Sequence, residues 1–205
     1  MILTPLDPDE LADTLDRYRS SLPAAGLAQL VFDRIAASGA DDAAPHWHGD
    51  AVALAETFGM RPIDEAPQAA FSWDGGAVRT ASEPAVLLHE VAHYQLASPA
   101  RRALPDFGLG AGPETGRVAE AEAARRLDDK AREREEQMAS LLGILWEIEL
   151  GQNGLAAFQE QNWLEGAGRP SAAAFFCATL QRLQDWGLAG ADGRPLHSLR
   201  ITADP

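Results

Sequence analysis

Cysteine, long apolar runs and basic residues are all scarce in this chain of 205 residues. The single cysteine, Cys177, excludes an internal disulfide. Because there is no Cys-x-x-Cys pair, histidine and carboxylate would have to hold any metal ion. No stretch approaches the roughly 18 apolar residues that a membrane span needs. Lys and Arg number 17 against 31 Asp and Glu, which gives a net charge of −14 and argues against a nucleic-acid partner.

The first residues carry no secretory signal, since Met1–Pro8 has no basic stretch followed by an apolar one. We therefore expect a cytoplasmic protein that makes no membrane contact. Hydrophobic residues make up 46% of the chain and charged residues 23%, which is ordinary for a globular protein. The length fits one domain over residues 1–205 with a substantial core.

The stretch that points to chemistry is His89-Glu90-Val91-Ala92-His93, an H-E-x-x-H pattern. Ser82 as N-cap, Pro84 in the first turn and Pro99 as the stop predict a helix around it. Histidines four apart lie on one helical face, so both imidazoles can reach one cation. Glu90 points about 100° away and can act on a metal-bound water. The alternative is an amphipathic helix whose His and Glu are merely solvated.

A catalytic zinc site usually has three protein ligands, so a third donor is needed beside His89 and His93. Glu136 is the main candidate, because it lies where a long helix predicted over residues 114–150 turns from charged to apolar. Its surroundings, Glu-x-x-Ala-x-x-Leu, match the glutamate helix of many H-E-x-x-H peptidases. Glu135 is the runner-up, since a shift of one residue would exchange the two. His197, near the C-terminus, is a weaker option.

Other residues near the motif suggest further roles. Tyr94, Arg101 and Arg102 are candidate substrate contacts, the arginines for a carboxylate or, equally, for surface acids. His46 and His48 form an H-x-H pair that can ligate a metal on an extended segment, although packing histidines in a loop explain them as well.

Residues 69–80 have the form of a β-hairpin around Asp74-Gly75-Gly76. A strand beside the active helix can hold an extended peptide by backbone pairing, or it can be purely structural. We predict a mainly helical α+β fold, zincin-like, with a small antiparallel sheet beside the H-E-x-x-H helix.

These residues resemble the zincin-like H-E-x-x-H group with a glutamate third ligand and, more narrowly, the elongation factor P hydroxylase family. The resemblance covers about residues 80–187. It is carried by His89-Glu90-x-x-His93, Ala97, Arg101-Arg102, Asp106-Phe107-Gly108, Glu136 and, more weakly, Pro170, Phe175, Ala178 and Leu180. It implies that His89, His93 and Glu136 bind a metal with Glu90 beside it. Leu109-Gly110-Ala111-Gly112 replaces an aromatic-rich stretch of that family.

Three functions fit the sequence. The first is a zinc-dependent hydrolase of the peptidase type, in which Glu90 is the general base and a peptide or protein is the substrate. The second is a non-haem iron protein hydroxylase, because two histidines and one carboxylate also suit iron. The third is a zincin scaffold without activity that binds a protein partner through its acidic helix.

Overall fold

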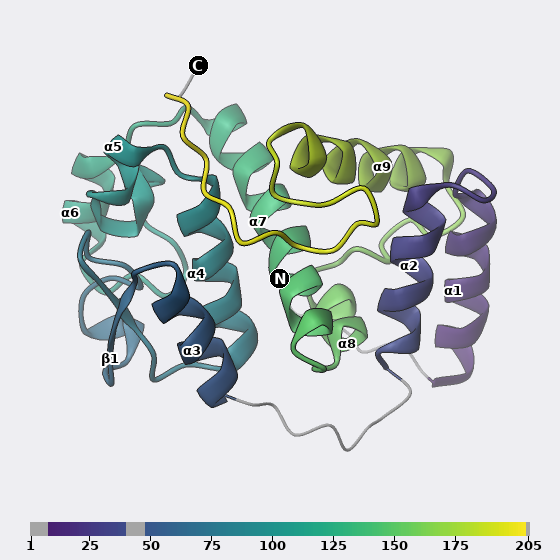
Figure 1. Ribbon diagram of the computed structural model, residues 1–205, viewed down its shortest axis with the longest axis horizontal. Helices are drawn as coiled ribbons and strands as arrows, with labels where there is room; N and C mark the ends of the chain where they lie inside the picture. Colours follow the sequence, from purple (N-terminus) through teal and green to yellow (C-terminus); the bar gives the residue numbers. More distant parts are fainter. Residues whose placement is uncertain (1–7, 40–47, 204–205) are drawn as a thin grey trace. The chain divides into compact units, whose positions relative to one another are not determined.

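Helices dominate the computed structural model, which describes residues 8–39 and 48–203 (Figure 1). The described helices are α1 (Pro8–Ser21), α2 (Leu27–Ala37), α3 (His48–Thr57), α4 (Pro84–Leu96), α5 (Pro99–Arg102), α6 (Val118–Ala124), α7 (Asp129–Glu149), α8 (Gly154–Glu160) and α9 (Pro170–Asp185). Short 3-10 helices are η1 (Pro67–Ala69) and η2 (Pro105–Gly108), and the strands are β1 (Arg61–Ile63) and β2 (Ala77–Arg79). The prediction of a mainly helical protein is confirmed. None of the described helices is both long enough and apolar enough to cross a membrane.

Packing divides the chain into two compact units, and α7 contributes residues to both. Unit 1 comprises Met1–Pro45 and Ile144–Leu196, and unit 2 comprises His46–Gly143 and His197–Pro205. The two histidines of the motif and the candidate third ligand all belong to unit 2. The prediction of one zincin-like domain over residues 1–205 stays a prediction.

Aromatic rings form the core of unit 1. Tyr18 of α1 stacks on Phe32 of α2 with ring centroids 4.9 Å apart, and it meets Phe158 of α8 and Phe176 of α9 edge-on. All four rings are almost fully buried. Burial of such a side chain contributes about 2–3 kcal/mol, so this cluster alone accounts for much of what holds the four helices together.

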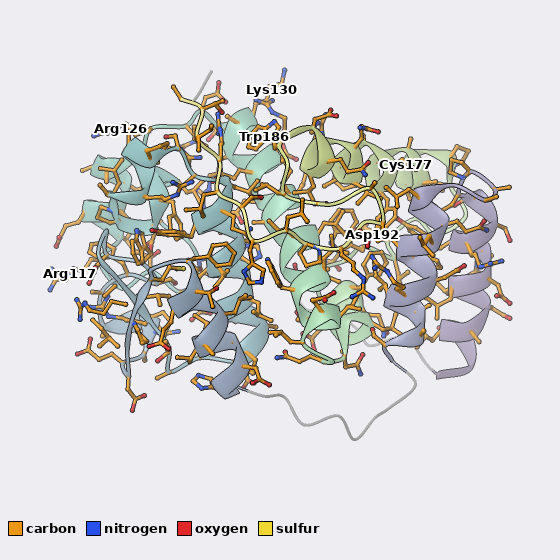
Figure 2. All side chains as sticks on the ribbon, viewed as in Figure 1. Arg117, Arg126, Lys130, Cys177, Trp186 and Asp192 are labelled. Atoms are coloured by element: carbon orange, nitrogen blue, oxygen red, sulfur yellow. The ribbon has the colours of Figure 1, made fainter. Side chains whose placement is uncertain are left out.

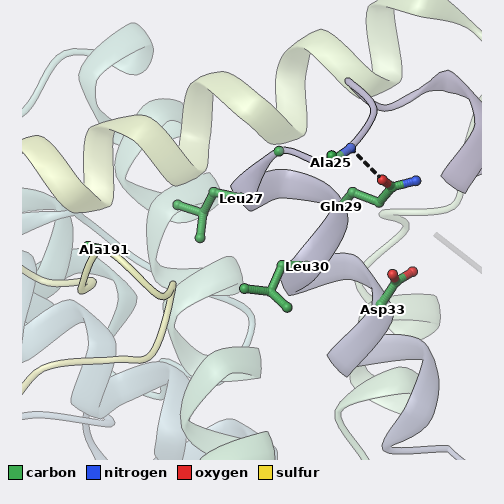
Figure 3. Close-up of a pocket in the computed structure, with 7 residues that line it drawn as sticks. Ala25, Leu27, Gln29, Leu30, Asp33 and Ala191 are labelled. Carbon is green, nitrogen blue, oxygen red and sulfur yellow. Dashed lines mark hydrogen bonds between the residues drawn. The ribbon is translucent and has the colours of Figure 1, made fainter.

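Two surface features of unit 1 carry no reactive chemistry. Cys177 lies half-buried on α9 (Figure 2), where burial raises the pKa of its thiol and keeps it in the unreactive protonated form. A hollow of about 470 Å³ lies beside the start of α2, and Leu27 and Leu30 line it (Figure 3). Asp33 at its rim is already paired with Arg19, at 2.7 Å. The hollow is therefore an apolar depression without a free ionisable group.

Unit 1 also buries a carboxyl group, that of Glu147 on α7. The side chain is 2% exposed, and its Oε1 has no hydrogen-bond partner among the described residues. Burial, with a smaller contribution from the charge of Glu160, raises the pKa of Glu147 to about 8. The folded protein therefore holds this carboxyl protonated at neutral pH, because a buried unpaired carboxylate is costly.

This burial predicts a pH dependence of stability. The pKa of Glu147 rises from about 4.5 in the unfolded chain to about 8 in the folded one. Between these values only the folded state keeps the proton, so Glu147 lowers the free energy of unfolding by about 1.4 kcal/mol for each pH unit by which the pH rises. We expect Glu147→Gln to remove this contribution and to be more stable than the wild type at pH 8 by up to about 4 kcal/mol.

Urea unfolding of both proteins at pH 5, 6, 7 and 8 measures the effect. Glu165→Gln, at an exposed position of the same unit, is the matched control. A constant difference in stability between Glu147→Gln and the wild type across this range would contradict the prediction.

The sheet of unit 2 is parallel, so the prediction of an antiparallel sheet is wrong. β1 pairs with β2 in the register Arg61↔Ala77, Pro62↔Val78 and Ile63↔Arg79. The Asp74 turn does form, since Oδ1 of Asp74 accepts from the backbone N–H groups of Gly76 and Ala77. The segment before that turn contributes one antiparallel bridge, Trp73↔Val78, and no strand. The reason is that its backbone groups bond to other segments, as described below.

Helix α4 is the central element of unit 2. It begins at Pro84, whose fixed φ suits the first turn, after the N-cap Glu83; the predicted N-cap, Ser82, is wrong. Leu87, Leu88, Val91, Ala92 and Leu96 are fully buried on its apolar face. The helix ends where Ala97 becomes extended, two residues before Pro99, in agreement with the predicted stop.

The long helix predicted over residues 114–150 is two helices, α6 and α7. Arg125 adopts an extended conformation, and the backbone N–H of Arg126 donates to the carbonyl of Gly108 at 2.8 Å. α7 then begins after Asp128, whose Oδ1 accepts from the backbone N–H of Ala131 at 2.7 Å, as an N-cap does. Asp128 is therefore a recognisable helix N-cap within a stretch whose composition otherwise favours one continuous helix.

The C-terminal segment, residues 197–203, belongs to unit 2 and is hydrogen-bonded to α4 (Figure 1). The backbone N–H of Arg200 donates to the carbonyl of Gln95 at 2.9 Å, and Nε2 of Gln95 donates to the carbonyl of Ser198. The guanidinium of Arg200 also reaches the carbonyl of Leu96, at 3.4 Å. No strand forms over residues 196–201; the segment instead donates hydrogen bonds to the last carbonyl groups of the helix that carries the motif.

Candidate metal centre

His89 and His93 lie one above the other on α4, as their spacing predicts. Their ring centroids are 4.6 Å apart, and their Nε2 atoms are separated by 3.0 Å. His93 is buried, with 4% of its side chain exposed, whereas 26% of the His89 side chain is exposed. The pair therefore presents two nitrogen donors to one point, which is open on the His89 side.

Glu136 of α7 completes the group. Its Oε2 lies 3.3 Å from Nε2 of His89 and 3.4 Å from Nε2 of His93. α7 can approach α4 because it carries a glycine at the contact: a Cβ added at Gly143 would lie only 3.4 Å from the backbone of His89. The structure thus brings the three predicted ligands together, although Glu136 lies 43 positions after His93 in the sequence.

The spacing of these three atoms fits a metal ion. Bonds of 2.0–2.1 Å to a tetrahedral ion place its ligand atoms about 3.3–3.4 Å apart, and an octahedral ion with similar bonds places adjacent ones about 3.0 Å apart. The three distances, 3.0, 3.3 and 3.4 Å, span this interval. Among the described residues these three form a group able to hold a metal ion.

The electrostatic field at the group favours a positive charge. Burial opposes ionisation of His93, yet Glu136 and Glu135 outweigh it and raise its pKa to about 10. Burial also opposes ionisation of Glu136, but His93 and His89 lower its pKa well below the ordinary range. Burial lowers the pKa of His89. His93 therefore carries a proton, and its positive charge lies where a metal cation would be bound.

Glu90 faces a different set of neighbours, as its position on the helix requires. Burial, together with the carboxylates of Asp106 and Glu136, raises its pKa to about 8, while His93 and a hydrogen bond with Ser72 oppose the rise. A carboxyl group with a pKa near neutrality is suited to accept and release a proton at physiological pH.

The three predicted substrate contacts have structural partners. Arg101 is 1% exposed and forms a two-pronged ion pair with Glu135, and this burial contradicts its assignment as a substrate contact. Arg102 donates to the carbonyls of Tyr94, at 2.8 Å, and Arg200, at 2.6 Å. The ring of Tyr94 packs edge-on against Trp73, at 5.2 Å. The contacts of Arg102 and Tyr94 hold the end of α4 in place, and their roles in substrate binding stay predictions.

Asp106-Phe107-Gly108, one of the runs that carry the family resemblance, forms a strained turn that was not predicted. Asp106 and Phe107 have left-handed φ values of 41° and 56°, which are costly for residues other than glycine. The ring of Phe107 stacks between His93, at 5.9 Å, and Trp73, at 5.7 Å. The turn therefore covers one face of the buried ligand. The signal in the sequence was Pro105-Asp106 with Gly108 two residues later, since these residue types are typical of turns.

The same turn blocks the segment predicted to hold an extended peptide. The backbone N–H of Asp106 donates to the carbonyl of Trp73 at 2.8 Å, and Oδ1 of Asp106 accepts from the backbone N–H of Trp73. The carbonyl of Ala70 accepts from the backbone N–H groups of Gly116 and Arg117. Because these groups are already bonded, the segment does not offer an open edge to a peptide beside α4.

The two other described histidines, His48 and His197, lie outside the cluster. Nε2 of His48 lies 2.5 Å from the carbonyl of Thr80, and the ring of His197 stacks on Phe58 with centroids 5.5 Å apart. His46 lies outside the described residues. Neither His48 nor His197 belongs to the group of possible ligands found among the described residues.

No protein-family model, curated protein or solved structure matches this chain. The resemblance to the elongation factor P hydroxylase family and to zincins therefore rests on the residues quoted for it and stays a prediction.

Proposed function

We propose that His89, His93 and Glu136 bind one divalent metal ion and that the protein is a metal-dependent hydrolase. The observation that carries the proposal is the spacing of their three donor atoms, at 3.0, 3.3 and 3.4 Å. Three protein ligands are the usual number at a catalytic site, in contrast to the four of a structural zinc site. Partial exposure of His89 and Glu136 leaves the group accessible from one side.

A metal ion held by His89, His93 and Glu136 would lower the pKa of a bound water towards neutrality. Glu90 would receive the proton of that water at its carboxylate and pass it to the leaving group. Desolvation and the nearby carboxylates of Asp106 and Glu136 keep its pKa close to neutrality, so both directions of proton transfer are accessible. Phe107 shields His93 on the protein side and keeps bulk water away from that ligand.

Zinc is the metal we propose, with iron as the alternative. The substrate we propose is a peptide or protein. The closed edge at Ala70–Trp73 favours a substrate that enters by a side chain or a chain end over one that adds a strand beside α4. The same closed edge favours a second function, an iron-dependent protein hydroxylase, because such an enzyme modifies a side chain and does not need an extended backbone.

Metal analysis of protein purified without oxygen tests both functions. The hydrolase predicts one zinc per chain and cleavage of a peptide library that Glu90→Gln abolishes while the zinc is retained. The hydroxylase predicts iron and oxygen uptake in the presence of its protein substrate. Protein that contains no metal and takes up neither ion on titration contradicts the metal site, and leaves a scaffold that binds a protein partner.

A further inference from the structure

The ion pair between Arg101 and Glu135 is buried beside the metal centre. The two side chains are 1% and 5% exposed, and Nη1 of Arg101 donates to Oε1 of Glu135 at 3.1 Å while Nη2 contacts Oε2. Nη1 also donates to the carbonyl of Phe107 at 2.9 Å. Removing two charges from water costs about as much as their attraction returns, so stability alone is a weak reason for such a pair.

A second observation lies on the other side of Glu135. Nδ1 of His93 is buried and has no hydrogen-bond partner among the described residues. Oε1 of Glu135 lies 3.6 Å from it. A shift of about 0.7 Å brings this contact to the length of a normal hydrogen bond. A neutral histidine that binds a metal through Nε2 carries its proton on Nδ1, and that N–H group needs an acceptor.

We propose that Glu135 is a positioning residue that accepts a hydrogen bond from the Nδ1–H group of His93, with Arg101 holding the carboxylate in place. This inference rests on the proposed metal site. The hydrogen bond fixes the imidazole of His93 with its Nε2 directed at His89 and Glu136. Glu135 then has a role other than metal ligand. The ion pair is then retained for orientation, which an apolar pair of the same volume cannot provide.

The geometry of α7 explains why two adjacent glutamates reach different nitrogens of the same imidazole. Consecutive residues on a helix point about 100° apart, so Glu136 reaches the Nε2 side of His93 while Glu135 reaches the Nδ1 side. One turn of α7 thus holds both nitrogens of one imidazole. The stacked ring of Phe107, whose carbonyl is bound by the same Arg101, restrains the plane of that imidazole.

The test separates orientation from stability by replacing both charges at once. In R101M/E135L the buried pair becomes apolar, which is often neutral or stabilising, but the acceptor at Nδ1 is lost. We expect the folded double variant to bind zinc and cobalt 10–100-fold more weakly and to show an altered visible spectrum of bound cobalt. In the zinc-bound protein, NMR of ¹⁵N-labelled histidine is expected to show that the Nδ1–H proton of His93 moves upfield and exchanges faster with water, because its hydrogen-bond acceptor is gone. E133L/R134M, at exposed positions of the same helix, is the matched control.

Glu135→Gln is the conservative variant, because its amide oxygen can still accept from Nδ1. It is expected to retain the hydrogen bond and most of the affinity, and its comparison with Glu135→Leu replaces the double variant if that one does not fold. Wild-type metal affinity and an unchanged Nδ1–H signal of His93 in folded R101M/E135L, or in Glu135→Leu beside Glu135→Gln, would overturn the positioning role alone. A wild-type protein that binds neither metal overturns the metal site and the positioning role together.

Discussion

Glu136→Ala is expected to weaken zinc binding by about 100-fold or more. Folded zinc sites with four ligands gain roughly 10–16 kcal/mol from the metal, which corresponds to about 3 kcal/mol for each ligand and to a factor of about 150 in affinity. Glu136 supplies one of the three donor atoms that meet at the centre, so its removal leaves two imidazoles and solvent. Competition of the metal-free protein with a chelator of known affinity measures the loss.

Glu133→Ala is the control for this experiment. Glu133 is exposed on the same helix, and its removal changes the net charge by the same amount without touching the histidines. We expect its affinity for zinc to stay within about twofold of the wild type, because exposed charges are screened by solvent and salt. Equal affinities of Glu136→Ala and Glu133→Ala would show that Glu136 is not a ligand.

Arg101→Met alone is expected to destabilise the protein by about 3–5 kcal/mol. The substitution leaves the carboxylate of Glu135 buried, 5% exposed, without the guanidinium that neutralises it, and the carbonyl of Phe107 loses its donor. A buried charge that has lost its partner costs far more than the intact pair contributes. Urea unfolding followed by circular dichroism measures the difference.

The double variant R101M/E135L gives the matched comparison. It removes both charges, so its free energy of unfolding is expected to recover to within about 1.5 kcal/mol of the wild type. A single Arg101→Met variant as stable as the wild type would mean that the pair is hydrated in solution and that its burial does not govern the stability of unit 2.

Local patterns predicted the helix of the motif well, for a physical reason. The position of Pro84, the buried series Leu87, Leu88 and Val91 and the stop before Pro99 are all encoded within a few residues of one another. Helical hydrogen bonds join residues four apart, so neighbouring residues carry the information that a helix needs.

Several predictions that depended on distant partners failed. Residues 69–80 contain the turn of a hairpin, but β2 pairs with β1 in parallel, and Asp106 takes the backbone groups of Trp73. Arg101 follows α4 in a segment that was expected to be exposed, yet it is buried and forms an ion pair with Glu135 of α7. Which strands pair and which charges pair depends on the segments that come together in the tertiary structure, and a local sequence pattern does not encode this.

By itself the sequence determined that two imidazoles stand one turn apart on a helix, since a spacing of four residues requires it. It also narrowed the third donor to two neighbouring glutamates, with His197 as a weaker option. Only the tertiary structure decided where the two glutamates lie, because the rotation of α7 against α4 turns Glu136 to Nε2 of both histidines and Glu135 to Nδ1 of His93. That rotation depends on how closely two helices pack at Gly143, and packing between elements far apart in the chain is a property of the whole unit.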